Sequence, residues 1–115
     1  MTPVVVLAVV SAGAVGAVLR YLVGLAGARA AWPWPVLLVN VVGSLVAGVA
    51  FHTDAALVVA TGFCGGLTTF STLSVETIQL LARGRRRAAA ASIALNLGLG
   101  LAAAALGWTL GSLVL

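Results

Sequence analysis

Four long apolar runs separated by short loops constrain this chain more than any other feature of its sequence. The runs cover residues 3–25, 36–51, 55–82 and 88–113, and only six arginines and two acidic residues stand among the 115 positions. A helix crosses a bilayer with about 20 apolar residues, whereas about a quarter of a soluble domain's residues are charged. The sequence therefore predicts a single all-α membrane domain, residues 1–115, with four transmembrane helices, and argues against a soluble or disordered chain.

The arginines all fall on one side of the predicted membrane. Arg20 and Arg29 belong to the end of the first run and the loop after it, and the other four stand at 83–87, between the third and fourth runs. The positive-inside rule assigns such loops to the cytoplasm. We therefore expect a multi-pass protein of the cell (plasma) membrane with both termini outside. Nucleic-acid binding is excluded, because the chain has no lysine and no aromatic stacking platform.

The third run contains a stretch that is unfavourable to a continuous helix. Gly65 and Gly66 are followed by Thr68 and Thr69, and both glycine and β-branched residues weaken a helix interior. We expect this helix to be broken mid-membrane, near residues 65–70. Irregular backbone at that depth is tolerated only inside protein or beside water, and broken helices of this kind often bind ions. A simple kink or a close helix crossing is the alternative.

Neutral polar side chains also lie within the apolar runs. Asn40 in the second run and Asn96 in the fourth would each serve as a hydrogen-bonded link between helices, or together line a polar path. Amide and hydroxyl donors, with Arg20 nearby, suit an anion better than a cation. Glu76 lies towards the arginine-rich loop, where it would face a vestibule, pair with an arginine, or be a plain interfacial charge.

The sequence offers no residues for enzymatic chemistry. His52 is the only histidine and Cys64 the only cysteine, so there is no ligand set for a transition metal and no intrachain disulfide. No nucleophile is paired with a base in a recognisable spacing. We predict that the chain is not an enzyme.

The sequence GFCGGLTTFST at residues 62–72 closely resembles the third-span signature of the fluoride channel family called Fluc or CrcB. Weaker similarities are GAVLRY at 16–21 and NVVGS at 40–44, and the length and four-run layout agree over essentially the whole chain. The resemblance implies a passive, fluoride-selective channel that allows fluoride efflux and lowers cytoplasmic fluoride. It also implies a dimer of two antiparallel subunits in the lipid bilayer, with two pores built at their interface.

The resemblance also implies roles for particular residues. A structural or activating sodium ion at the dimer centre would be held by the backbone carbonyls of Gly65 and Thr68. The fluoride path would combine an amide, a ring edge, a hydroxyl and an arginine that draws anions to the vestibule, namely Asn40, Phe70, Ser71 and Arg20.

One position departs from the family pattern. Leu73 stands where the family usually has a second phenylalanine, and leucine offers no polarised ring edge to an anion. Together with the one-sided arginines, this favours pairing with an oppositely oriented homologue, while pairing with a second copy stays open. The alternatives are a non-conducting partner subunit of a heterodimeric fluoride channel, and a small four-helix proton-coupled multidrug exporter. The exporter needs a membrane-embedded carboxylate, which the first run lacks.

Overall fold

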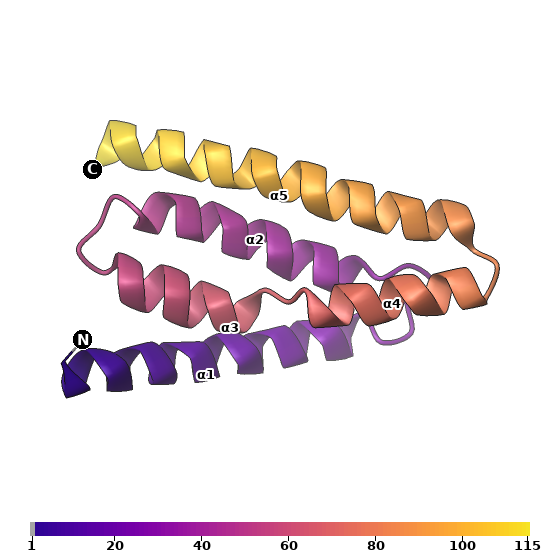
Figure 1. Ribbon diagram of the computed structural model, residues 1–115, viewed down its shortest axis with the longest axis horizontal. Helices are drawn as coiled ribbons and strands as arrows, with labels where there is room; N and C mark the ends of the chain where they lie inside the picture. The colour runs from indigo at the N-terminus through magenta and orange to yellow at the C-terminus, as the bar shows by residue number, and fades with distance from the viewer. Residues whose placement is uncertain (1) are drawn as a thin grey trace.

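The computed structural model of the chain describes residues 2–115 and contains no β-strand among them. The chain runs back and forth as four helical spans, the third of which lies between the first and the second in Figure 1. This architecture confirms the all-helical prediction. The elements are α1 (Pro3–Ala26), α2 (Trp34–Ala50), η1 (Leu57–Cys64), α3 (Gly65–Leu67), α4 (Ser71–Ala82) and α5 (Arg86–Val114).

Three of the spans are long and apolar enough to cross a membrane. They are α1, the third span taken from Leu57 to Ala82, and α5, while α2 is apolar but shorter, with 17 residues. Seventeen residues at 1.5 Å each rise about 26 Å, close to the thickness of the hydrocarbon core. Large apolar side chains cover the outside of the bundle, as expected of a surface that faces lipid rather than water.

The helix ends follow from local sequence. Thr2 caps α1, because its side-chain oxygen accepts a hydrogen bond from the Val5 N–H at 3.2 Å, and Pro3 occupies a position where no N–H is needed. The turn between α4 and α5 contains Gly84 with φ 75°, a conformation that favours glycine. This turn lets α5 fold back after only a few residues.

Both arginine-bearing loops lie at one end of the bundle, and the two termini lie at the other (Figure 1). The indole N–H of Trp32 donates to the carbonyl of Ala88 at 3.3 Å. A guanidinium N–H of Arg85 donates to the carbonyl of Ala31. These bonds join the loop after α1 to the turn before α5, so the positive charges of the chain gather at this end.

Close contacts at glycines hold the helices together. A Cβ on Gly16 of α1 would collide with the carbonyl oxygen of Phe63, and one on Gly66 would collide with that of Gly13. In α5, Gly107 lies equally close to the backbone of α2. Lipid supplies little hydrophobic drive between helices, so close packing at small residues provides much of the association.

Candidate functional site

The third span is interrupted for three residues between α3 and α4, of which Phe70 already has helical backbone angles. α3 ends at Leu67, Thr68 has extended backbone with φ −79° and ψ 157°, and α4 begins at Ser71. Gly65, by contrast, is helical, with φ −62° and ψ −37°. The non-helical part therefore occupies residues 68–70, after the glycines rather than at them.

The side chain of Asn40, from α2, bonds to the backbone of this interruption. Its Oδ1 accepts a hydrogen bond from the Thr69 N–H at 2.8 Å, and its Nδ2 donates to the Thr69 carbonyl at 3.2 Å. Nδ2 also donates to Oδ1 of Asn96 on α5 at 2.9 Å. An asparagine amide has two N–H donors, and both donors of Asn40 are thus bonded to protein.

The interruption leaves two carbonyls free of helical bonds. In a continuous helix the carbonyl of Gly65 would accept from the Thr69 N–H, which here bonds to Asn40. The carbonyl of Thr68 would accept from the Thr72 N–H, which instead donates to Thr69 Oγ1 at 3.1 Å. Within residues 2–115 neither carbonyl receives a hydrogen bond. Both expected sodium ligands therefore have free acceptor atoms, of the kind that hard cations bind.

Hydroxyl groups gather where α4 begins. Thr69 Oγ1 lies 3.3 Å from Ser71 Oγ and donates to Thr72 Oγ1 at 3.2 Å. The N-terminus of a helix also carries a partial positive charge. The start of α4 is therefore an environment of donors and positive potential, which favours an anion.

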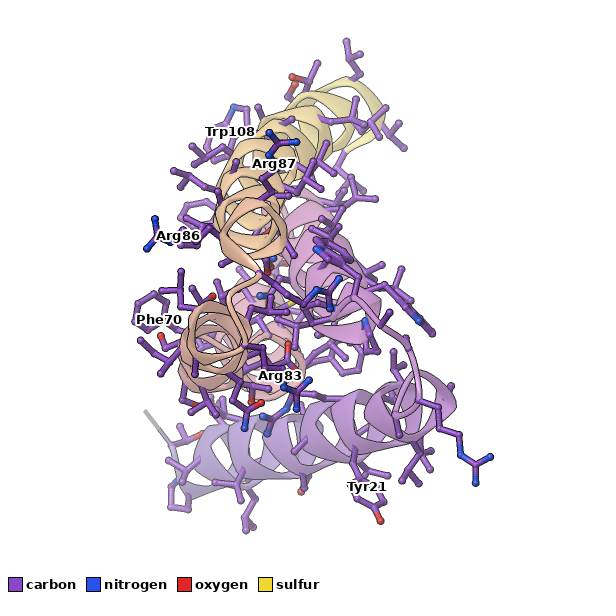
Figure 2. All side chains as sticks on the ribbon, turned by 90° about the vertical axis from the view of Figure 1, so that its right-hand side faces the viewer. Tyr21, Phe70, Arg83, Arg86, Arg87 and Trp108 are labelled. Atoms are coloured by element: carbon purple, nitrogen blue, oxygen red, sulfur yellow. The ribbon has the colours of Figure 1, made fainter. Side chains whose placement is uncertain are left out.

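The residues expected to line the path do not all face the same space within one chain. Phe70 is 82% exposed and, in Figure 2, points away from the other helices on the outer side of α4. Ser71 is also exposed, whereas Leu73 is partly buried. Asn40 is partly buried and turned towards α5. Any path along Phe70 therefore runs on the outer surface of this subunit.

A cavity of about 280 Å³ connects the arginine-bearing end with the interruption. It lies between the end of α1, the loop after it, the start of α2, and α4. Its apolar wall includes Val36 and Val39. Its polar wall consists of Arg20, Thr69, Thr72, Glu76, Gln79 and Arg83.

Two charged side chains in this cavity have buried atoms without partners. Neither Arg20 Nε nor Glu76 Oε2 has a hydrogen-bonding partner within the described chain. Arg83, which also lines the cavity, lies between α4 and α1 in Figure 2. A polar space of this volume has room for several water molecules, and Arg20 contributes positive charge to its wall.

The spacing of residues in the sequence, rather than their types, predicts the polar wall of the cavity. Five of its polar residues follow one another on the third span at intervals of three, four, three and four, which places them on one face of a helix. Residue types alone drew attention to Glu76 as a vestibule residue and left the others of this face without a role there. The set is Thr69, Thr72, Glu76, Gln79 and Arg83.

The comparisons with known proteins agree with the fold. The chain matches the family described as "CrcB-like protein, Camphor Resistance (CrcB)" over residues 7–108. A curated relative from Bordetella petrii, named "Fluoride-specific ion channel FluC", is 44% identical over 93 residues, which is 73% of each chain. One from Natronomonas pharaonis, "Fluoride-specific ion channel FluC 2", is 46% identical over 110 residues and covers 92% of this chain and 93% of its own.

A third relative, "Fluoride-specific ion channel FluC" of Nitrobacter winogradskyi, is 40% identical over 91 residues, 69% of this chain and 72% of its own. The apolar helices and the family together define a multi-pass membrane protein of the ion-channel class, not an enzyme. The chain belongs to the CrcB (FluC) family, as the motif at residues 62–72 predicted.

Proposed function

We propose that this chain forms a fluoride-selective channel through which fluoride leaves the cell passively, so that the cytoplasmic concentration falls. The observation that carries the proposal is the interruption at residues 68–70, because a cavity containing unpaired Arg20 leads directly to it. The relatives named as fluoride-specific channels support fluoride as the ion. Family membership favours a channel over the proton-coupled exporter.

The chemistry of the path suits a small, strongly hydrated anion. Fluoride gives up water only where other donors replace it, and conduction requires that no group hold it too tightly. Ser71 supplies a hydroxyl, and the edge of the Phe70 ring is positive without being a fixed charge. Arg20 raises the local concentration of anions in the cavity before they reach these weaker groups.

The exposure of Phe70 supports a dimer. A ring that is 82% exposed on the outer side of α4 forms only one wall of a path, so a second subunit would supply the other. We propose an antiparallel partner, as the resemblance to the family implies. Under the positive-inside rule the arginine-bearing end of this chain faces the cytoplasm, with both termini outside. That bias favours an oppositely oriented homologue over a second copy.

The free carbonyls of Gly65 and Thr68 support a sodium ion at the centre of such a dimer. Gly65 is exposed on this subunit, and both carbonyls lack donors from residues 2–115. A sodium ion bound there would supply positive charge between the subunits. The carbonyls of this chain would hold the ion, while the Asn40–Thr69 bonds keep the Gly65 carbonyl free.

The decisive experiment is fluoride efflux from proteoliposomes, measured with a fluoride electrode. The chain is reconstituted alone and with an oppositely oriented homologue, in sodium or in a bulky organic cation. We expect efflux that requires sodium and is reduced by Phe70→Leu, whereas Phe51→Leu at the opposite end serves as the control. A complex whose efflux is insensitive to Phe70→Leu would support the non-conducting subunit instead.

The same vesicles test the choice of partner. Efflux that appears only when the homologue is present supports the heterodimer. Full efflux from this chain alone, with cysteine labelling of both orientations, would overturn it and leave the homodimer. A chain that conducts neither alone nor with the homologue contradicts the channel proposal.

A further inference from the structure

Asn96, in the middle of α5, is linked to the interruption by its hydrogen bond to Asn40, and it has no direct hydrogen bond to residues 68–70 within the described chain. We infer that Asn96 is a positioning residue, which orients the Asn40 amide so that this amide bonds to the backbone of Thr69. The expected effect of Asn96 on fluoride efflux rests on the proposed channel function, whereas its effect on the orientation of Asn40 is tested separately. It assigns α5 a part in setting where the fluoride path begins.

The contact lies in a place where unpaired polar groups are costly. Asn96 is 7% exposed and Thr69 is 9% exposed, and Ser92, one turn before Asn96, is 0% exposed. Buried amides away from water are stable only when their donors and acceptors are bonded. Turning either amide would leave buried polar atoms unpaired, so the observed orientation is the stable one.

The hydrogen bonds determine a direction from α5 to the third span. Nδ2 of Asn96 donates to the carbonyl of Ser92 at 2.8 Å, so Oδ1 is the atom that Asn96 presents to Asn40. Because Oδ1 of Asn96 is an acceptor, the atom of Asn40 that faces it must be the donor Nδ2. The Oδ1 of Asn40 is then left to accept from the Thr69 N–H. Reversing either amide would oppose two donors or two acceptors.

This orientation has a consequence for the ion path. Because its N–H is bonded to Asn40, Thr69 does not make the helical hydrogen bond to the Gly65 carbonyl. The Gly65 carbonyl is thereby freed, and Thr69 Oγ1 accepts from the Thr72 N–H and starts α4. Asn96 therefore influences the groups around the interruption through the orientation of Asn40.

A matched control lies one turn away on the same helix. The Ser92 hydroxyl is buried and has no hydrogen-bonding partner in the described chain, while its carbonyl is the atom that Asn96 uses. Ser92→Ala removes the hydroxyl and keeps the carbonyl. Removing an unsatisfied buried hydroxyl costs little, so this variant perturbs α5 without touching the bonds in question.

The test follows hydrogen exchange of the Thr69 amide by NMR in the full chain labelled with ¹⁵N-threonine. In Asn96→Leu we expect exchange to accelerate by about fivefold to tenfold, the factor for one net hydrogen bond, with no change in Ser92→Ala. If the leucine variant does not fold, Asn96→Ser replaces it, because a serine side chain is too short to reach Asn40. We expect the same acceleration of Thr69 amide exchange in this variant. Unchanged Thr69 exchange in the folded Asn96 variants would overturn the inference.

Fluoride efflux of the same proteins separates the two proposals. Asn96→Leu should slow efflux by about tenfold, and adding it to Asn40→Ala should cause no further loss, because residues acting through one contact are not additive. If Thr69 responds but the unmodified complex does not conduct, the positioning holds and the channel proposal fails. If the complex conducts and the two variants act additively, Asn96 does not act through Asn40.

Discussion

The two halves of the third span are stabilised by different chemistry, although one follows the other in a single apolar run. The first half, η1 and α3, lies against α1 at backbone distance, with Gly66 against the carbonyl of Gly13. The second half, α4, borders a cavity of about 280 Å³ that contains Glu76 and Arg20. One half is packed closely against α1, and the other forms a wall of a polar cavity.

The difference shows what the interruption accomplishes. Three residues outside the helices, 68–70, separate a segment whose Gly62 and Gly66 lie against the backbone of α1 from a segment whose side chains face a cavity. The bonds of Asn40 to Thr69 hold the two at their junction. A continuous helix would have to approach α1 closely and present polar side chains to the cavity without a change of backbone direction between the two parts.

The largest effect is expected in the close-packed half. Gly16→Ala places a Cβ 2.8 Å from the Leu67 backbone nitrogen and even closer to the carbonyl of Phe63. Backbone atoms cannot move aside cheaply, so we expect a loss of about 3 kcal/mol in stability, seen as loss of monodisperse protein on size exclusion. Gly24→Ala, on the same helix with nothing within 4 Å, should remain folded. Equal behaviour of the two would refute the close packing.

The next effect concerns the half of the third span that borders the cavity. Arg20→Gln removes a positive charge from the cavity wall, and we expect fluoride efflux to fall about tenfold, with a weaker dependence on ionic strength. Arg29→Gln, in the loop but outside the cavity lining, is the control and should change efflux little. A similar loss in both variants would mean that total charge matters, and not the cavity.

A smaller effect of opposite sign is expected at Glu76. Its buried Oε2 has no partner in the described chain, so Glu76→Gln removes negative charge without breaking a bond at that atom. We expect efflux to rise about threefold at low ionic strength, since the potential of the cavity becomes more favourable to anions. Asp54→Asn, at the opposite end of the bundle, is the control. A decrease in Glu76→Gln would indicate that the carboxylate supports the path.

The smallest effect tests the junction itself. Thr69→Val keeps the shape of the side chain but removes the hydroxyl that accepts from the Thr72 N–H. Loss of such a cap costs about 1 kcal/mol, measurable as a modest drop in thermal stability. Thr109→Val, which removes an exposed hydroxyl bonded to the Ala105 carbonyl on α5, is the comparison. If Thr109→Val lowers thermal stability as much as Thr69→Val or more, the bond from Thr72 to Thr69 does not stabilise the start of α4 in particular.

The third span illustrates how far residue types could predict the structure. The glycines and threonines suggested a break near residues 65–70, and the non-helical backbone lies at 68–70. The glycines themselves stay helical, because their lack of a side chain serves the contact of Gly66 with Gly13. Glycine weakens a helix in isolation, but the neighbouring helix decided which residues left it.

The candidate site was less accessible from the sequence. Asn40 was expected to line the path, and Asn96 was weighed as a link between helices or a part of the same path. Their contact joins residues 56 positions apart, and the bonds of Asn40 to Thr69 join residues 29 apart. No periodicity within one run reports such a pair. The polar face that includes Glu76 and Arg83 was visible in the spacing, but the cavity beside it was not.

The sequence by itself determined that this is a helical membrane protein of the CrcB (FluC) family. Run length, composition and the motif at residues 62–72 are local properties, and a bilayer leaves an apolar run few alternatives to a helix. Only the tertiary structure decided that Asn96 bonds to Asn40 and that Arg20 and Glu76 share one cavity. Those facts depend on how closely the glycine-bearing faces pack, which brings distant polar groups within bonding distance.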